Sequence, residues 1–252
     1  MRIFTSATEA AGEVQRDLWE MGHRVVTKSM QDKVGEFSTY EMVGYSFCLT
    51  KLEENIYPAL DVLKITDPDG VKNYIEEEWK YRMGLTPWDS DPTRLRPDVW
   101  DQFREADGKF SYTYRHRLVE ADNDDHDWPE YWPEYSQLGQ LTELHLNDSQ
   151  SRQLVMTMYD KHQDGENRGG IRRVPCTMHY QVLDRGNEFY LIDNMRSCDL
   201  YTHFVVDMIV AYKMALFLAE QMGSENIKWP KLIMTFGSLH AYETDLKKRQ
   251  IF

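Results

Sequence analysis

A cysteine and several arginines stand close together in the sequence and could carry out nucleophilic chemistry. Cys176 follows a proline in "RRVPCTMHYQV", with Arg172 and Arg173 just before it, and "NMRSCD" at 194–199 adds Arg196. Guanidinium groups beside a thiol lower its pKa and favour the nucleophilic thiolate. They also bind phosphate through paired hydrogen bonds. The residue types therefore predict an anionic substrate attacked by sulfur, although an isolated cysteine is more often a small buried apolar residue.

The composition restricts the kinds of partner. The chain has 252 residues, 41% of them hydrophobic, and a formal net charge of −13. This length supports one substantial core, and the acidic surface repels nucleic acid and anionic lipid, so we expect neither a nucleic-acid nor a membrane partner. Cys48, Cys176 and Cys198 do not form a disulfide or metal pattern, and the N-terminus has no apolar signal region. We therefore expect a cytoplasmic protein without a metal.

One hydrophobic run invites comparison with a membrane span. The segment "FVVDMIVAYKMALFLAEQM" at 204–222 is interrupted by Asp207 and Lys213. Its apolar stretches are shorter than the roughly 20 residues that a span requires. The run is predicted to be a buried helix.

Helix signals recur along the chain. Ser6 and Glu9 form a capping box that predicts a helix over about 7–22. A turn is expected in "DPDG" at 67–70, and a helix in "VKNYIEEEWKYRM" after it. Further helices are expected in "PDVWDQFREADG" and in "SQLGQLTELHL".

Strand signals alternate with these helices. Strands are expected in "TYEMVGYSFCL", "RQLVMTMY" and "KLIMTFGSLHAY", and "CTMHYQVLDRGNEFYLIDNM" is predicted to be a hairpin. An acidic and aromatic insertion near 118–136 has neither period and is expected to be irregular. The elements favour an α+β fold with a mixed sheet flanked by helices, in a single domain over 1–252.

Longer stretches carry a family resemblance. The segment "VPCTMHYQVLDRGNEFYLIDNMRSCDLYTHFVVD", together with "GSLHAY", resembles the catalytic core of the thymidylate synthase family over roughly 145–242. The words "NMRS", "EMVGYSF" and "YIEEEWKYR" are most similar to its phage branch, the deoxycytidylate (dCMP) hydroxymethylases. The resemblance implies a sheet-mediated homodimer, a pyrimidine nucleoside monophosphate substrate and 5,10-methylenetetrahydrofolate as co-substrate.

The resemblance also implies roles for the nucleotide site. Cys176 corresponds to the nucleophile that adds to C6 of the pyrimidine. Arg196 and Ser197 match phosphate contacts, and Arg196 also polarises the thiol. His240 and Tyr242 match the pair that hydrogen-bonds the sugar 3′-hydroxyl.

Further roles follow for the second subunit and the folate. Arg152 matches an arginine that reaches the phosphate across the dimer interface. Asp199 matches the aspartate that holds the pterin, and Trp79 and His203 are expected beside it. His203 replaces a glycine, and it either narrows the folate site or caps the helix. Glu78 matches the glutamate that shuttles protons near the base.

Two of these assignments have strong alternatives. Glu78 belongs to three successive glutamates, which on a helix usually form a solvated face. Tyr112 in "FSYTYR" matches a tyrosine beside the nucleophile, and a core aromatic is about as probable from its surroundings.

Asp207 is the residue expected to determine which pyrimidine base is preferred. Thymidylate synthases carry asparagine here, whose amide pairs with the N3–H donor and O4 acceptor of uracil. Cytosine inverts this pattern, so a carboxylate accepts from its 4-amino group while a proton shared with N3 completes the pair. An unpaired buried polar group costs about 1–3 kcal/mol, which favours cytosine roughly ten- to a hundredfold. A mid-helix aspartate in an apolar run also has no evident structural reason.

Three functions remain open from the sequence. Water added to the exocyclic carbon gives 5-hydroxymethyl-dCMP or 5-hydroxymethyl-CMP, the expected reaction. Hydride transfer gives a methyl product, as in a thymidylate synthase or a dCMP methylase. A non-catalytic nucleotide-binding relative is the third reading, because Gln153 replaces a second cross-dimer arginine and only ten residues follow Tyr242 (252 − 242). Lys28 or Lys33 could replace the missing arginine.

Overall fold

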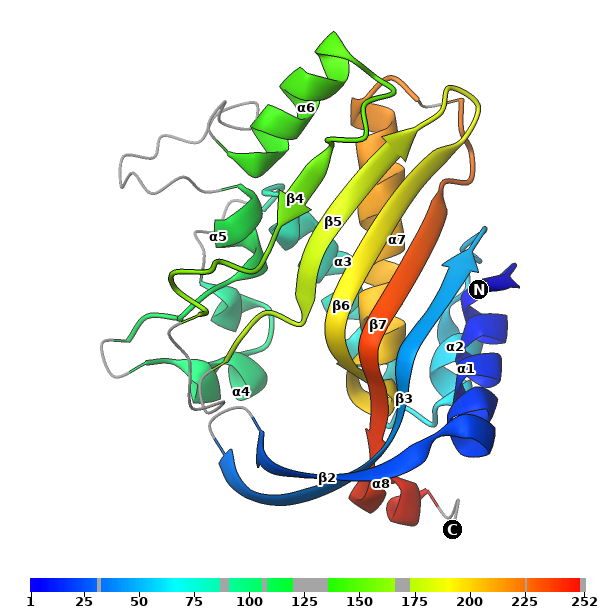
Figure 1. The fold of residues 1–252 in the computed structure, drawn as a ribbon, viewed down its shortest axis with the longest axis vertical. Coiled ribbons are helices and arrows are strands. Elements are labelled where there is room, and N and C mark those ends of the chain that lie inside the picture. Colours follow the sequence, from blue (N-terminus) through cyan, green and yellow to red (C-terminus); the bar gives the residue numbers. More distant parts are fainter. Residues whose placement is uncertain are drawn as a thin grey trace.

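The computed structural model describes residues 1–30, 33–86, 91–105, 108–119, 136–165, 173–224 and 226–249, and the side chains of 29, 30, 33, 34, 98, 99 and 102 are also outside the description. Within these ranges the strands form one seven-stranded mixed sheet (Figure 1). Its order is β1-β3-β7-β6-β5-β4, and β2 pairs with β3. The strands are β1 (Arg2–Phe4), β2 (His23–Met30), β3 (Lys33–Leu49), β4 (Val155–Thr157), β5 (Thr177–Asp184), β6 (Phe189–Asp199) and β7 (Lys231–Tyr242).

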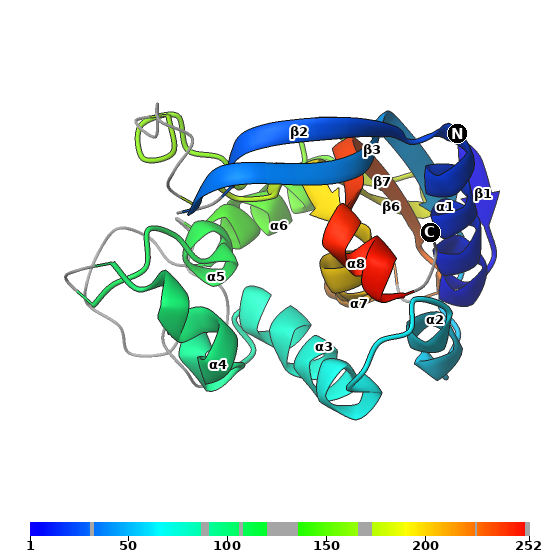
Figure 2. The ribbon, with the colours of Figure 1, turned by 90° about the horizontal axis from the view of Figure 1, so that it is seen from below.

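The helices lie mainly on one face of this sheet. Figure 2 shows α7, α3, α2 and α8 below the strands β2, β3 and β7, with no labelled helix above those strands. The α-helices are α1 (Ala7–Met21), α2 (Tyr57–Val62), α3 (Pro68–Arg82), α4 (Pro97–Trp100), α5 (Tyr114–Leu118), α6 (Gln137–Asn147), α7 (Val205–Gln221) and α8 (Glu243–Lys248). Short 3₁₀ turns occupy Pro92–Arg94 and Asp101–Phe103, and a π-helical turn at Leu200–Phe204 leads into α7. The α+β class with a mixed sheet is therefore confirmed.

The α7 helix forms the centre of the core. Leu200–Gln221 is long and apolar enough to cross a membrane by length and composition, but 67% of its most apolar window is buried inside the protein. Met208, Ile209, Val210 and Ala211 are all fully buried. The prediction of a buried helix is confirmed, because most of α7 is enclosed within the protein.

Most predicted elements are present, with shifted boundaries. The hairpin is β5 and β6, turning where Gly186 adopts a φ of 77° and its N–H donates to Asp184 at 2.7 Å. The turn expected at 67–70 is wrong, because Asp67 caps α3 and the helix begins at Pro68. The strand expected in "RQLVMTMY" covers only Val155–Thr157. The irregular insertion near 118–136 falls mostly on 120–135, outside the described residues.

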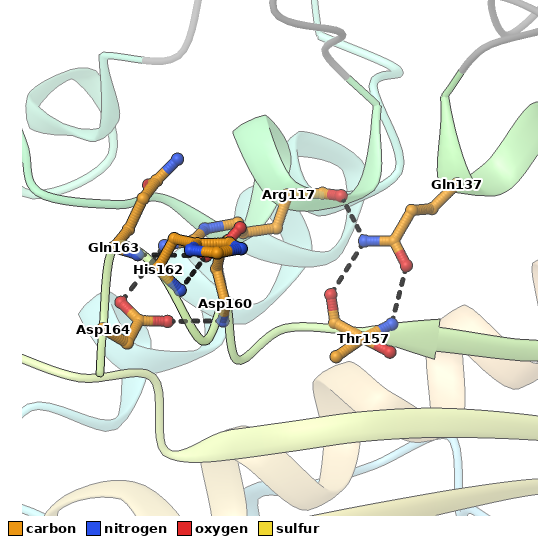
Figure 3. Close-up of polar contacts among 7 residues, drawn as sticks. All are labelled: Arg117, Gln137, Thr157, Asp160, His162, Gln163 and Asp164. Atoms are coloured by element: carbon orange, nitrogen blue, oxygen red, sulfur yellow. Dashed lines mark hydrogen bonds and ion pairs between the residues drawn. The ribbon is translucent and has the colours of Figure 1, made fainter. Parts of the chain in front are cut away.

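A group of polar contacts fastens the loop after β4 (Figure 3). The Gln137 amide donates to the carbonyls of Arg117 and Thr157 at 2.6 and 2.8 Å, and accepts from the Thr157 N–H at 2.6 Å. Arg117 also pairs with Asp164 at 3.1 Å and with Asp160 at 3.7 Å. These contacts tie β4 and its following loop to α5 and α6, which fixes the surroundings of the first residues of β5.

Candidate active site

The β5–β6 hairpin brings the predicted nucleophile to the predicted phosphate residues. Cys176 immediately precedes β5, and its carbonyl accepts from the Arg196 N–H on β6 at 2.7 Å. The Cys176 Sγ lies 3.9 Å from the Ser197 Oγ and 3.9 Å from the Arg196 Nη2. The thiol, a hydroxyl and a guanidinium therefore converge on one point.

The Arg196 guanidinium is held in a fixed orientation. Its Nε donates to the Pro175 carbonyl and its Nη2 to the Val174 carbonyl, each at 2.9 Å, while Nη1 donates to the Ser197 Oγ at 3.0 Å. Gly237 on β7 faces the Arg196 backbone, and a Cβ there would lie 2.8 Å from the Arg196 carbonyl oxygen. The close approach of β7 therefore depends on a glycine at this position.

The electrostatic surroundings of the thiol differ from the sequence prediction. Burial raises the pKa of Cys176 above its ordinary value. Arg196, a hydrogen bond from Ser197 and the charge of Arg173 lower that pKa, whereas Asp207 raises it. The expectation that arginines leave the free thiol with a lowered pKa is wrong, because desolvation outweighs them. Arg172 lies outside the described residues.

Arg173 lies in an aromatic cage beside the thiol. Its Cζ is 4.8 Å from the Trp100 ring centroid, 4.1 Å from that of Phe103 and 5.0 Å from that of Tyr112. Its Nε and Nη1 are buried without a hydrogen-bond partner in the described part of the chain. The three ring faces stabilise this positive charge in place of hydrogen bonds.

The structure adds a tyrosine that the sequence reasoning did not select. The Tyr114 hydroxyl accepts from the backbone N–H groups of Cys176 and Thr177, both at 3.2 Å. Tyr112, the predicted residue, packs edge-on against Tyr114 with ring centroids 6.0 Å apart, and burial raises its pKa to about 12. The sequence signal for this role was Tyr114, the second tyrosine of "FSYTYR". Its hydroxyl contacts the backbone of the nucleophile.

Asp207 and Glu78 meet at a buried arginine. Arg82 on α3 donates to Glu78 at 2.7 Å and lies 3.5 Å from Asp207 in the first turn of α7. Glu78 is 1% exposed, so the reading of a solvated glutamate face is wrong for this residue. The expectation that Asp207 lacks a structural partner is also wrong, because it pairs with Arg82, and its Oδ2 lies 4.0 Å from the Cys198 Sγ.

A second buried acid, Asp193 on β6, was not anticipated. It is 1% exposed, and burial followed by the charge of Asp207 raises its pKa to about 8. It pairs in register with Tyr180 on β5, whose hydroxyl accepts from Arg82 at 3.2 Å. Asp193 occupies an alternating inward position of a strand, a signal that was readable in the sequence but was not used.

The predicted sugar and pterin residues lie together at the ends of β6 and β7. Asp199 pairs in register with His240, and the His240 and Tyr242 rings are 5.5 Å apart. Burial lowers the pKa of His240, and burial with the charge of Asp199 raises that of Tyr242 to about 12. Asp199 Oδ1 accepts from the Tyr201 N–H at 3.1 Å.

The other predicted residues have different surroundings. Trp79 packs against Phe217 with centroids 5.9 Å apart, ten positions beyond Asp207 on α7 (217 − 207). His203 is exposed on the π-helical turn, and Arg152 is exposed in the loop before β4. Lys28 is exposed, and the Lys33 side chain is outside the described set. No group of three or more His, Cys, Asp or Glu suited to a metal is found in the described ranges.

Comparison with known proteins assigns the chain to a family. The family model of thymidylate synthase matches residues 27–251, and the chain belongs to that family. A search of curated proteins found no match. Among solved structures, the thermostable thymidylate synthase A from Bacillus subtilis aligns with a TM-score of 0.65 at 15% identity, covering 98% of this chain and 83% of that chain. At this identity the structural match supports the fold alone.

Family membership has a direct chemical consequence. The family transfers a one-carbon unit from 5,10-methylenetetrahydrofolate to C5 of a pyrimidine nucleotide, so this chain is a one-carbon transferase of that kind. Neither match favours the phage dCMP hydroxymethylases over other members of the family.

Proposed function

We propose that this protein hydroxymethylates C5 of dCMP or CMP, with 5,10-methylenetetrahydrofolate and water as the other reactants and tetrahydrofolate as the second product. The observation that carries the proposal is the acidic side chain of Asp207, which lies 3.5 Å from Arg82 in the first turn of α7. The charge of Asp207 influences the Cys176 thiol, so both groups act within one site.

Cys176 acts as the nucleophile in this proposal. Its sulfur bonds to C6 of the pyrimidine, and the electron pair of the C5–C6 double bond makes C5 nucleophilic. Arg196 and Ser197 contact both the sulfur and each other, so they stabilise the thiolate and bind the phosphate. A dianionic phosphate beside these groups opposes thiolate formation, so the fixed guanidinium has to balance both charges.

Asp207 reads the base. A carboxylate oxygen accepts from the 4-amino group of cytosine, and a proton on N3 is shared with the other oxygen. Uracil presents its O4 acceptor to the same carboxylate, and this repulsion disfavours it. Glu78, joined to Asp207 through Arg82, is assigned proton transfer near the base.

The remaining roles concern the sugar and the folate. His240 and Tyr242 hydrogen-bond the sugar 3′-hydroxyl, and Asp199 holds the pterin. When bound, the folate supplies the one-carbon unit at the formaldehyde oxidation level. Trp79, which packs against Phe217, and exposed His203 are assigned to the outer part of the folate site.

The active form is proposed to be a homodimer in the cytoplasm. The strands β2, β3 and β7 have no labelled helix on one side (Figure 2), and that sheet face suits a second copy. Exposed Arg152 then reaches the phosphate site of the partner, in a single-domain chain without a metal.

A two-substrate assay tests this function. Purified protein is given dCMP, CMP or dUMP with methylenetetrahydrofolate, and the product is identified by mass. We expect 5-hydroxymethyl-dCMP or 5-hydroxymethyl-CMP without dihydrofolate, and Asp207→Asn shifts the preference toward dUMP. Exclusive turnover of dUMP by the unaltered protein would reject the proposal.

The methylating alternative shares every step up to the exocyclic methylene, and it is distinguished in the same assay. A methyl product is lighter by one oxygen and is accompanied by dihydrofolate. The non-catalytic alternative gives no covalent 5-fluoro-dCMP adduct in the presence of folate, with Cys176→Ser as the control.

A further inference from the structure

Arg82 lies at the centre of a buried network beside Asp207. Its Nε donates to Glu78 at 2.7 Å, its Nη1 donates to the Tyr180 hydroxyl at 3.2 Å, and its Nη2 lies 3.5 Å from Asp207 Oδ1. Its Cζ is 4.1 Å from the Tyr114 ring centroid. Arg82 is only 4% exposed, so contacts from four elements, α3, α5, β5 and α7, fix its guanidinium.

This network holds more negative than positive groups. Glu78 Oε2 and Asp193 Oδ1 are buried and have no hydrogen-bond partner within the described residues. Such oxygens in a native interior require an explanation. The titratable groups that influence Arg82 or Asp207 from the surrounding elements are Tyr74, Glu78, Tyr114, Cys176, Tyr180, Asp193 and Cys198. Each of these groups becomes negative when it ionises and then disfavours a neighbouring carboxylate, whereas the Arg82 charge stabilises it.

We propose that Arg82 is a specificity-determining positioning residue, which holds Asp207 in its carboxylate form and so excludes uracil. The inference rests on the proposed function, because it concerns the side chain assigned to read the base. Arg82 acts through Asp207, and its own donors are directed to Glu78, Tyr180 and Asp207.

The reason lies in the two protonation states of a carboxyl group. A carboxylate only accepts, so it pairs with the cytosine 4-amino group and with a proton on N3, and it repels uracil O4. A neutral carboxylic acid has one donor and one acceptor. It turns its O–H toward N3 of cytosine or toward O4 of uracil, so it satisfies either base. A cation that keeps Asp207 ionised therefore sharpens the choice of base.

Variants of Arg82 test this specificity role. Arg82→Gln is expected to lower the ratio of kcat/KM for dCMP over dUMP about tenfold, because a hydrogen bond of ordinary strength no longer separates the bases. Arg82→Lys keeps the positive charge and should retain most of the preference. In the Asp207→Asn background, Arg82→Gln should leave the ratio unchanged, because the group that Arg82 controls is absent.

Proton uptake provides a readout that needs no variant. Because N3 must gain a proton to meet a carboxylate, the unaltered protein is expected to take up about one proton per bound dCMP. Calorimetric titration in buffers of different ionisation enthalpy measures this number. In Arg82→Gln the cation opposite Asp207 is absent, so the uptake should be smaller than in the unaltered protein.

The outcomes separate the two proposals. If the unaltered protein does not prefer dCMP to dUMP, the proposed function fails. If it prefers dCMP but binds it without proton uptake, or if Arg82→Gln folds and keeps the full preference, the role of Arg82 is overturned while the proposed function stands. A purely structural role would lower activity toward both nucleotides equally in Arg82→Gln.

Discussion

The Tyr114 hydroxyl supports the backbone of Cys176 directly. It accepts from the N–H groups of Cys176 and Thr177 at 3.2 Å each, at the point where β5 begins. The same ring covers the Arg82 guanidinium at 4.1 Å. One tyrosine therefore links the position of the nucleophile to the charged network that surrounds Asp207.

Removing that hydroxyl should impair the nucleophile. Tyr114→Phe leaves two backbone donors without their acceptor, which we expect to cost about 1–3 kcal/mol of unfolding free energy. The rate of covalent adduct formation should fall about tenfold, since the Cys176 backbone loses a fixed contact. Denaturant unfolding and trapping with 5-fluoro-dCMP measure the two effects. Tyr112→Phe is the matched control, and an equal loss in that variant would contradict a specific role for Tyr114.

The thiol of the free protein should react slowly at neutral pH. Burial raises the pKa of Cys176, so the thiolate fraction increases only as the pH rises through that raised value. Alkylation followed by peptide mass analysis should show a rate at Cys176 that grows with pH beyond the range of a free cysteine. Arg196→Gln should slow alkylation further at each pH, because Arg196 lowers the thiol pKa. Faster alkylation in that variant would reject this account.

Asp193 should make stability fall as the pH rises. Burial raises its pKa to about 8, so between its unfolded value near 4 and about 8 the native state binds one more proton than the unfolded state. The stability that comes from the neutral acid is thus complete below the unfolded value and is lost as the pH rises through the folded value. Relative to Asp193→Asn, the unfolding free energy of the native protein should fall by about 1.4 kcal/mol per pH unit across this window.

Denaturant unfolding at several pH values checks this dependence. The matched control is Asp160→Asn, because backbone hydrogen bonds lower the pKa of Asp160. The difference in unfolding free energy between this variant and the native protein should therefore not change with pH above about 5. A difference between Asp193→Asn and the native protein that does not change with pH would refute the buried-acid assignment.

Mixing inactive variants tests the shared site. If Arg152 serves the partner subunit, Cys176→Ser and Arg152→Ala dimers are each impaired, and exchange of subunits restores one complete site per mixed dimer. Equal mixing should recover about a quarter of the native activity, because half of the dimers are mixed and each has one working site. The measurement is activity after subunit exchange. Recovery no greater than the sum of the two parents would place Arg152 outside the partner's site.

The predictable part of the fold came from local patterns. The capping box gave α1 within one residue, and the glycine-containing turn gave the β5–β6 hairpin that brings Arg196 to Cys176. The helix at 204–222 followed from a long apolar run, because most positions of a largely buried helix are apolar. Such signals depend on residues close in sequence, so they can be interpreted without knowledge of tertiary contacts.

The unpredictable part depended on contacts across the fold. Arg82 and Asp207 are 125 positions apart (207 − 82), and no local pattern pairs them. The pKa of Cys176 depends on how deeply the thiol is buried, which spacing to arginines does not reveal. The inward position of Asp193 follows from strand alternation, but the influence of the Asp207 charge on its pKa depends on a contact across the fold.

The position of Arg82 between two carboxylates limits how this enzyme's base preference can evolve. Replacing Asp207 by a neutral amide leaves Arg82 with Glu78 alone, in an interior where a changed charge balance is costly. A lineage that exchanges one pyrimidine for the other must therefore alter α3 and α7 together, or pass through a poorer intermediate. Directed evolution that randomises the two positions jointly should reach a new substrate in fewer rounds than stepwise mutagenesis.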